Sequence, residues 1–148
     1  MTTSKRKEEE ELRKLSVEMR YLEQTAETLQ QRISMLNAAM TDLTYARMTL
    51  EGVEKEQGKE SSELFVPIGG GSYVKAKLAD SDKVIVSLGS DVSVEKPVVE
   101  AKAILKERLE ELSKSAIAAQ QQFGQVADRI NSNRTRLETL LASVRERQ

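Results

Sequence analysis

The sequence contains no cysteine and no histidine, and aromatic residues make up only 3% of it. Without cysteine or histidine the chain can form no disulfide, offers no thiol nucleophile or imidazole base, and cannot hold zinc through those ligands. Its aspartates and glutamates show none of the spacing typical of a carboxylate metal site. The sequence therefore predicts that this protein is not an enzyme and carries neither a metal nor a cofactor.

Long apolar runs are also absent. No stretch approaches the roughly 18 apolar residues of a membrane span, and no apolar segment follows a basic N-terminus as in a signal peptide. The 23 basic and 24 acidic residues nearly cancel, and four glutamates directly follow the basic triplet at 5–7, which argues against a nucleic-acid surface. We expect a cytoplasmic protein with no nucleic-acid partner and no membrane partner.

The two prolines lie outside two long segments in which apolar residues recur in heptads. Segments 12–50 and 105–144 each hold about six unbroken heptads, and the d positions of the first are all leucine. Arms of equal length around a compact insert predict an antiparallel coiled-coil hairpin, with arms of roughly 60 Å. A parallel dimer would show the same seam, but the insert and the equal arms favour the hairpin.

The middle segment has a different period. Between residues 64 and 96 the apolar residues repeat with a period near 2, and turns rich in glycine and aspartate separate four short runs, which predicts two β-hairpins. The four predicted strands are 64–68, 73–78, 83–88 and 92–96. Gly69-Gly70-Gly71 is a hairpin turn and not a phosphate-binding loop, since neither Gly-Lys-Ser/Thr nor a helix follows it.

The predicted fold is mainly α: a long antiparallel coiled-coil α-hairpin with two β-hairpins inserted between the helices. We expect Pro67 at a strand edge or irregularity and Pro97 in the first turn of the second helix. The expected divisions are an N-terminal coiled-coil helix at 1–57, a linker at 58–63, two β-hairpins forming an oligomerisation body at 64–96, and a C-terminal coiled-coil helix at 97–148.

Four short strands cannot bury enough apolar surface to be stable alone in water. Apolar residues lie on both faces of the run 84–86, and unpaired strand edges favour association. We therefore expect an intersubunit sheet or barrel; the alternative is that the helix roots, with Ala101 and Ile104, cover the hairpins within a monomer. The residues expected to make the intersubunit contacts are Val66, Ile68, Val74, Val84, Val86, Val92 and Val94.

Two polar residues interrupt the apolar seam, Arg47 at an a position and Asn133 at a d position. Single polar seam residues usually fix the register, and they can also loosen the coil locally. The numbers of facing residues should add up to about 152 or about 159 in an antiparallel pair. We favour the second register, which sets Ala26 beside Asn133 and Leu15 beside Val144.

Three apolar residues lie outside the seam near the open end of the coil: Val17, Tyr21 and Leu141. Single exposed apolar residues are common. Three within the outer heptads form an adaptable apolar surface if this tip frays. They are the candidate residues for binding a partner.

The layout and the middle residues together resemble the α-class subunits of prefoldin. The matching stretches are Leu64-Phe65-Val66-Pro67-Ile68-Gly69, Tyr73-Val74, Leu78, Lys83-Val84-Ile85-Val86, Gly89, Val94-Glu95-Lys96 and Val99-Glu100-Ala101. The resemblance covers the whole chain in architecture and the middle residues in motif-level detail. Two hairpins instead of one mark the α class against the β class.

This resemblance implies an ATP-independent molecular chaperone, a holdase. It implies a hexamer, with two α-class and four β-class subunits in the archaeal form, whose hairpins build a β-barrel body and whose coiled-coil tentacles enclose a cavity. It further implies that the tentacle tips hold non-native polypeptides and pass them to a group II chaperonin. Residues 64–96 would then build the barrel, and Val17, Tyr21 and Leu141 would contact the substrate.

A second hypothesis is a structural coiled-coil subunit of a ring or filament, in which the coils act as spacers. A holdase needs its tip residues to capture unfolded protein, whereas a spacer does not. Truncation of the tip therefore distinguishes the two hypotheses.

Overall fold

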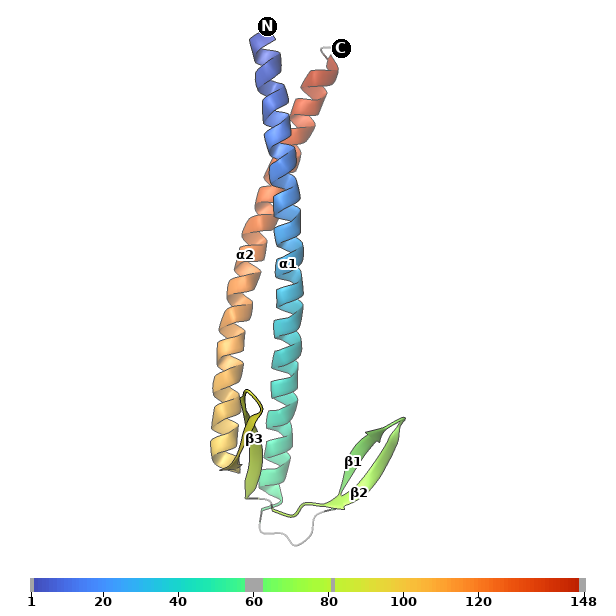
Figure 1. Ribbon diagram of the computed structural model, residues 1–148, viewed down its shortest axis with the longest axis vertical. Coiled ribbons are helices and arrows are strands. Elements are labelled where there is room, and N and C mark those ends of the chain that lie inside the picture. The colour runs from blue at the N-terminus through green and yellow to red at the C-terminus, as the bar shows by residue number, and fades with distance from the viewer. Residues whose placement is uncertain (1, 58–62, 81, 147–148) are drawn as a thin grey trace. The chain divides into compact units, whose positions relative to one another are not determined.

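Two long helices flank two β-hairpins along the chain (Figure 1). The computed structural model describes residues 2–57, 63–80 and 82–146. The elements are α1 (Thr2–Lys55), β1 (Glu63–Gly69), β2 (Ser72–Lys77), β3 (Lys83–Gly89), β4 (Val92–Pro97) and α2 (Val98–Glu146). The predicted mainly α fold with two inserted hairpins is confirmed. Most of the expected linker, residues 58–62, lies outside the described residues.

The second helix begins one residue later than expected. Pro97 is the last residue of β4, where it pairs with Lys83, and α2 starts at Val98. The main-chain N–H of Val98 donates to the carbonyl of Asp82 at 3.0 Å. This carbonyl, which directly precedes β3, satisfies one of the free donors at the start of the helix. The start of α2 is therefore joined by its main chain to the beginning of β3.

The chain divides into two compact units, one with residues up to 38 and from 113 onward (unit 1) and one with residues 39–112 (unit 2). Unit 1 is a pair of helical segments packed along an apolar seam. Its buried side chains all occupy predicted a or d positions and are Leu29, Ala116, Ala119, Asn133 and Leu140. The heptad pattern therefore identified the seam of this unit correctly.

Two ion pairs cross between the helices of unit 1. Arg136 Nε lies 2.7 Å from Glu11 Oε1, and Arg129 Nε lies 2.8 Å from Glu18 Oε1. The second pair is one heptad later on α1 and one heptad earlier on α2. This order shows that the two segments run antiparallel, as the sequence predicted.

The favoured register, with facing numbers near 159, is wrong. In that register residue 18 would lie level with residue 141, about 12 residues or 18 Å along α2 from Arg129, yet Arg129 and Glu18 form an ion pair. The register near 152 leaves this pair within reach of its two long side chains and is compatible with the structure. Ala26 therefore does not face Asn133.

The core of unit 2 joins the ends of the helices to the hairpin β3–β4. Its buried residues are Leu50, Val86, Val98, Ala101 and Leu105, and half-buried Val84 and Ile104 pack against them. Arg108 of α2 donates to the carbonyl of Ser87 in β3, and Lys102 Nζ lies 2.7 Å from Glu54 Oε2 across the two helices. The alternative that the helix roots cover the strands within one chain thus holds for β3–β4, since the chain's own helices cover one face of this hairpin.

The two hairpins are copies of one another in their pairing. Val66 pairs with Val74 as Val86 pairs with Val94, and every pair in β3–β4 has a counterpart 20 residues earlier in β1–β2. Both ladders also shift register at the same point before the turn, which in β1–β2 follows Pro67. Pro67 therefore lies at a strand irregularity, as predicted.

The two turns have the same shape but different residues. Gly70 and Gly71 have φ angles of 58° and 72°, and Ser90 and Asp91 have φ angles of 50° and 61°. Two successive positive φ angles are typical of the type I′ turn, which suits the twist of a two-residue hairpin. Glycine adopts this backbone without strain, so the first turn is the easier one to form.

The repeat provides a matched test of the core. We expect Val86→Ala to lower the free energy of unfolding by about 2 kcal/mol, because it leaves a cavity in a packed site. The counterpart Val66→Ala should cost about 0.5 kcal/mol or less, because this side chain is exposed. Urea unfolding of the isolated chain measures both, and equal losses would contradict the assignment of the core to β3–β4.

Candidate functional site

The hairpin β1–β2 carries exposed apolar side chains on both faces. Residues directly opposite each other in the ladder share a face, so Val66 and Val74 lie on one face and Phe65 and Lys75 on the other. Phe65 is 65% exposed, and Val66 and Val74 are 41% and 48% exposed. Apolar surface on both faces of a two-stranded sheet is unstable in water unless another surface covers it.

The predicted assembly residues divide between the two hairpins. Val86 is buried in the chain's own core, and Val84 and Val94 are half-buried. The remaining predicted residues are exposed and are Val66, Ile68, Val74 and Val92. The helices thus cover one face of β3–β4 and leave these residues of β1–β2 exposed.

The strand edges of both hairpins are also free within the described chain. Each sheet has two strands, β1 with β2 and β3 with β4. Each strand therefore pairs on one side only and leaves N–H and C=O groups on the other. Such edges accept a further strand.

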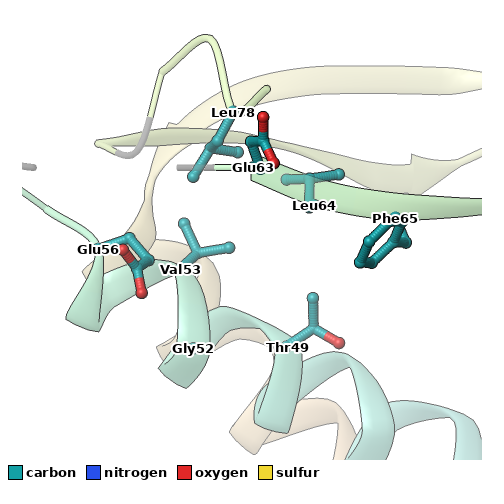
Figure 2. A pocket seen from close by; sticks show the side chains of 8 residues that line it. All are labelled: Thr49, Gly52, Val53, Glu56, Glu63, Leu64, Phe65 and Leu78. Atoms are coloured by element: carbon teal, nitrogen blue, oxygen red, sulfur yellow. The ribbon is translucent and has the colours of Figure 1, made fainter. Parts of the chain in front are cut away.

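A cleft of about 540 Å³ lies between the end of α1 and the hairpin β1–β2 (Figure 2). Thr49 and Val53 point from the helix toward the strand, and Phe65 points back toward the helix. The residues that line the cleft are Thr49, Gly52, Val53, Glu56, Glu63, Leu64, Phe65 and Leu78. The only charged groups in the lining are the carboxylates of Glu56 and Glu63, and the other side chains are small or apolar. Such a lining is suited to packing against another apolar surface.

Across the described ranges, no group of three or more His, Cys, Asp or Glu residues could hold a metal ion. In the same part of the chain, no helix has the length and apolar character needed to cross a membrane.

The three predicted tip residues are exposed. Val17 and Tyr21 are 66% and 69% exposed and lie one turn apart on the same face of α1, and Leu141 on α2 is 46% exposed. In the register near 152, Leu141 lies level with Glu11, roughly 9 Å from Val17 along the coil. Unit 1 therefore carries exposed apolar side chains on both helices near this end.

Within the described parts of the heptad segments 12–50 and 105–144, four further exposed large apolar residues were not singled out from the sequence: Met35, Tyr45, Met48 and Ile117. Each occupies a b, c or f position of its heptad, which points away from the seam. This placement was visible in the sequence and would have identified them as exposed.

The ion pairs of unit 1 shift the pKa values of their members. A hydrogen bond from Arg136 lowers the pKa of Glu11 below its ordinary value of 4.5, and the same contact raises the pKa of Arg136. Arg136 bonds both carboxylate oxygens, at 2.7 and 3.0 Å, a geometry that favours the charged form. A hydrogen bond from Arg129 likewise lowers the pKa of Glu18.

The two polar seam residues are incompletely satisfied. Asn133 is 6% exposed and lies close enough to Glu18 to lower its pKa further, but Asn133 Nδ2 forms no hydrogen bond of ordinary geometry. Arg47 Nε is also buried without a partner among the described residues. Unsatisfied buried groups destabilise the seam locally.

The chain is similar to proteins of one family. The family model described as Prefoldin, prefoldin subunit, matches residues 22–143. A protein named prefoldin subunit alpha from Methanococcoides burtonii is 35% identical over 136 residues, which cover 92% of this chain and 89% of that protein. Its namesake from Pyrococcus horikoshii is 36% identical over 120 residues, which cover 81% and 80%.

A solved structure has a similar fold. It is a chain from the cryo-EM structure of filamentous PFD from Methanocaldococcus jannaschii, with a TM-score of 0.65 and 23% identity. The match covers 79% of this chain and 95% of that chain.

The lowered carboxyl pKa values predict a specific acid response. A group whose pKa is lower in the folded state stabilises the fold above its unfolded value, here 4.5, and this contribution disappears as the pH falls through the folded value. We expect the double variant Glu11→Gln, Glu18→Gln to lose less stability than the wild type between about pH 5 and pH 3. Thermal unfolding followed by circular dichroism at each pH measures the difference.

Glu9→Gln is the control for this experiment, since Glu9 is an exposed carboxylate on the same helix. It should follow the wild-type curve. Parallel pH curves for the wild type and the double variant would show that the two ion pairs do not stabilise unit 1.

Proposed function

Because this chain belongs to the prefoldin subunit family, we propose that it is an α-class subunit of an ATP-independent chaperone, a holdase, and has no catalytic activity. The observation that carries this proposal is the uncovered hairpin β1–β2, whose two faces expose Val66, Val74 and Phe65. A chain that leaves this surface unsatisfied needs partner subunits.

The proposed assembly role belongs to the hairpins. Free strand edges and exposed apolar faces allow the hairpins of several chains to join into one sheet or barrel. The relatives are named alpha subunits, and the partners that we propose are β-class subunits, with two α and four β subunits in a hexamer.

The proposed client role belongs to the end of unit 1 that carries the chain termini. Val17, Tyr21 and Leu141 are exposed there. Burial of one such side chain contributes roughly 1.5–3 kcal/mol, so a single arm binds an unfolded chain weakly. Several arms acting on one client raise the affinity by avidity. Weak single contacts also allow release to a group II chaperonin without nucleotide hydrolysis.

A second candidate is a structural subunit of a filament. The observation that favours it is that the similar solved chain comes from a filamentous assembly. In such a role the exposed residues of unit 1 would not be needed to bind unfolded proteins. We propose the cytoplasm as the site of either role.

Substitution of the tip residues tests the chaperone function. The triple variant Val17→Ser, Tyr21→Ser, Leu141→Ser is co-expressed with a β-class prefoldin subunit, and the complex is mixed with a guanidinium-unfolded enzyme on dilution without nucleotide. We expect its capacity to suppress aggregation to fall by roughly tenfold or more, because each arm formed by this chain loses apolar contacts and avidity multiplies the loss. Light scattering measures aggregation.

The matched control is Gln24→Ser, Gln31→Ser, Gln125→Ser, which changes three exposed polar residues of unit 1 to the same side chain. It should keep full activity, and both complexes should keep the wild-type mass in native mass spectrometry. Full activity of the Val17, Tyr21 and Leu141 variant would contradict client capture by these residues and favour the structural role.

A second arm of the experiment tests assembly. Val66→Asp with Val74→Asp places two carboxylates on a face that is exposed in the single chain, so we expect the chain to fold and fail to join its partners. An assembled complex of normal mass would contradict the proposed role of β1–β2.

A further inference from the structure

One face of α1 in unit 2 carries no charge. We name it the uncharged face, and at 100° per residue its members fall within a sector of about 100°. Its residues are Thr41, Tyr45, Met48, Thr49 and Gly52. Asp42 and Glu56 border it. A helix surface that faces water alone is normally polar or charged. The equivalent heptad positions nearer the start of α1 mix charged residues, such as Arg13, with polar ones, such as Gln24 and Gln31.

The uncharged face exposes large apolar side chains. Tyr45 is 64% exposed and Met48 is 60% exposed. Both point away from the seam, so neither contributes to the coiled coil of its own chain. Water therefore contacts two of the larger apolar side chains of α1 at adjacent positions on one face.

The hydroxyl of Thr49 needs no external partner. Thr49 Oγ1 donates to the carbonyl of Tyr45 at 3.0 Å, and at the border of the face Thr44 Oγ1 donates to the carbonyl of Met40 at 2.8 Å. These hydroxyl donors are satisfied within the helix. Removal of water from these two threonines thus costs little in lost hydrogen bonds.

Gly52 has no structural reason within the chain. A glycine inside a helix costs about 1 kcal/mol relative to alanine, and nothing in the described structure lies within 4 Å of the position that a Cβ would occupy. The position is therefore open, and a group from outside the chain can approach the backbone there. A flat position between exposed Tyr45 and Met48 and the cleft suits close approach of a second backbone.

The uncharged face continues into the cleft. Thr49 and Gly52 belong to the face and also line the cleft, and the opposite wall holds Leu64 and Phe65 of β1 (Figure 2). Strand β1 pairs only with β2 and keeps one free edge. A strand that joins this edge would thus lie beside the uncharged face of α1.

We propose that the uncharged face and the cleft together form a seat for a β-hairpin of a neighbouring subunit. The occupant pairs with the free edge of β1 and lays its apolar side chains on Tyr45, Met48 and Gly52. From Thr41 to Gly52 the face is about 16 Å long, which matches a strand of five or six residues at about 17–20 Å. This inference rests on the proposed assembly function and adds the helix face to the contact.

Single cysteines test the seat, because the chain has none of its own. Met48→Cys places a thiol on the uncharged face, and Met35→Cys places one on α1 in unit 1, where Met35 is 73% exposed. We expect assembly with a co-expressed β-class prefoldin subunit to slow maleimide labelling of Cys at 48 by about tenfold or more, as burial in an interface core requires. Labelling at 35 should change by less than about twofold.

Cross-linking identifies the occupant. A benzophenone maleimide attached at position 48 should form a product with a hairpin strand of a neighbouring subunit, and isotope-labelled copies of this chain distinguish products between chains from products within one chain. Unchanged labelling at position 48, or a product with the same chain, with a helix or with added unfolded protein, would overturn the seat. If Met48→Cys alone fails to assemble while Met35→Cys assembles, the result supports it.

The two proposals fail in different ways. A wild-type chain that reaches no assembled mass with its partner contradicts the proposed function. An assembled complex in which position 48 is labelled as fast as in the isolated chain contradicts only the seat on α1.

Discussion

The rest of the structure depends on one apolar junction. Val86 of β3 packs there with Val98, Ala101 and Leu105 of α2 and with Leu50 of α1. The first N–H of α2 is bonded to the carbonyl of Asp82, so the start of this helix is joined to the hairpin that it covers. This junction packs only against β3–β4 among the described hairpins. Its copy 20 residues earlier has the same ladder and a similar apolar face, but its Val66 and Val74 remain exposed. The need for partner subunits follows from this imbalance.

Most of the fold could be predicted because its signals are local. Heptads placed Leu29, Ala116 and Leu140 in the seam, and a period of 2 with glycine turns gave both hairpins. Each pattern depends only on residues that are close together in the sequence. The polar seam residues Arg47 and Asn133 were also found, and the structure adds that both have unsatisfied buried atoms.

What could not be predicted depends on contacts between distant segments. Nothing near Lys96 indicates that the carbonyl of Asp82 serves the start of α2, and identical ladders do not reveal which hairpin the helices cover. The coiled-coil register required the long-range pair of Glu18 and Arg129. The tip residues Val17, Tyr21 and Leu141 are exposed, as their places outside the seam predicted.

Hydrogen–deuterium exchange of the two hairpins, in the isolated chain and in the assembled complex, tests the central claim most directly. A two-stranded hairpin without a covered face is marginally stable, so amides of 64–76 should exchange much faster in the isolated chain than their counterparts at 84–96. Assembly should then slow exchange at 64–76 strongly and at 84–96 less. Equal protection of both hairpins in the isolated chain, unchanged on assembly, would contradict the account.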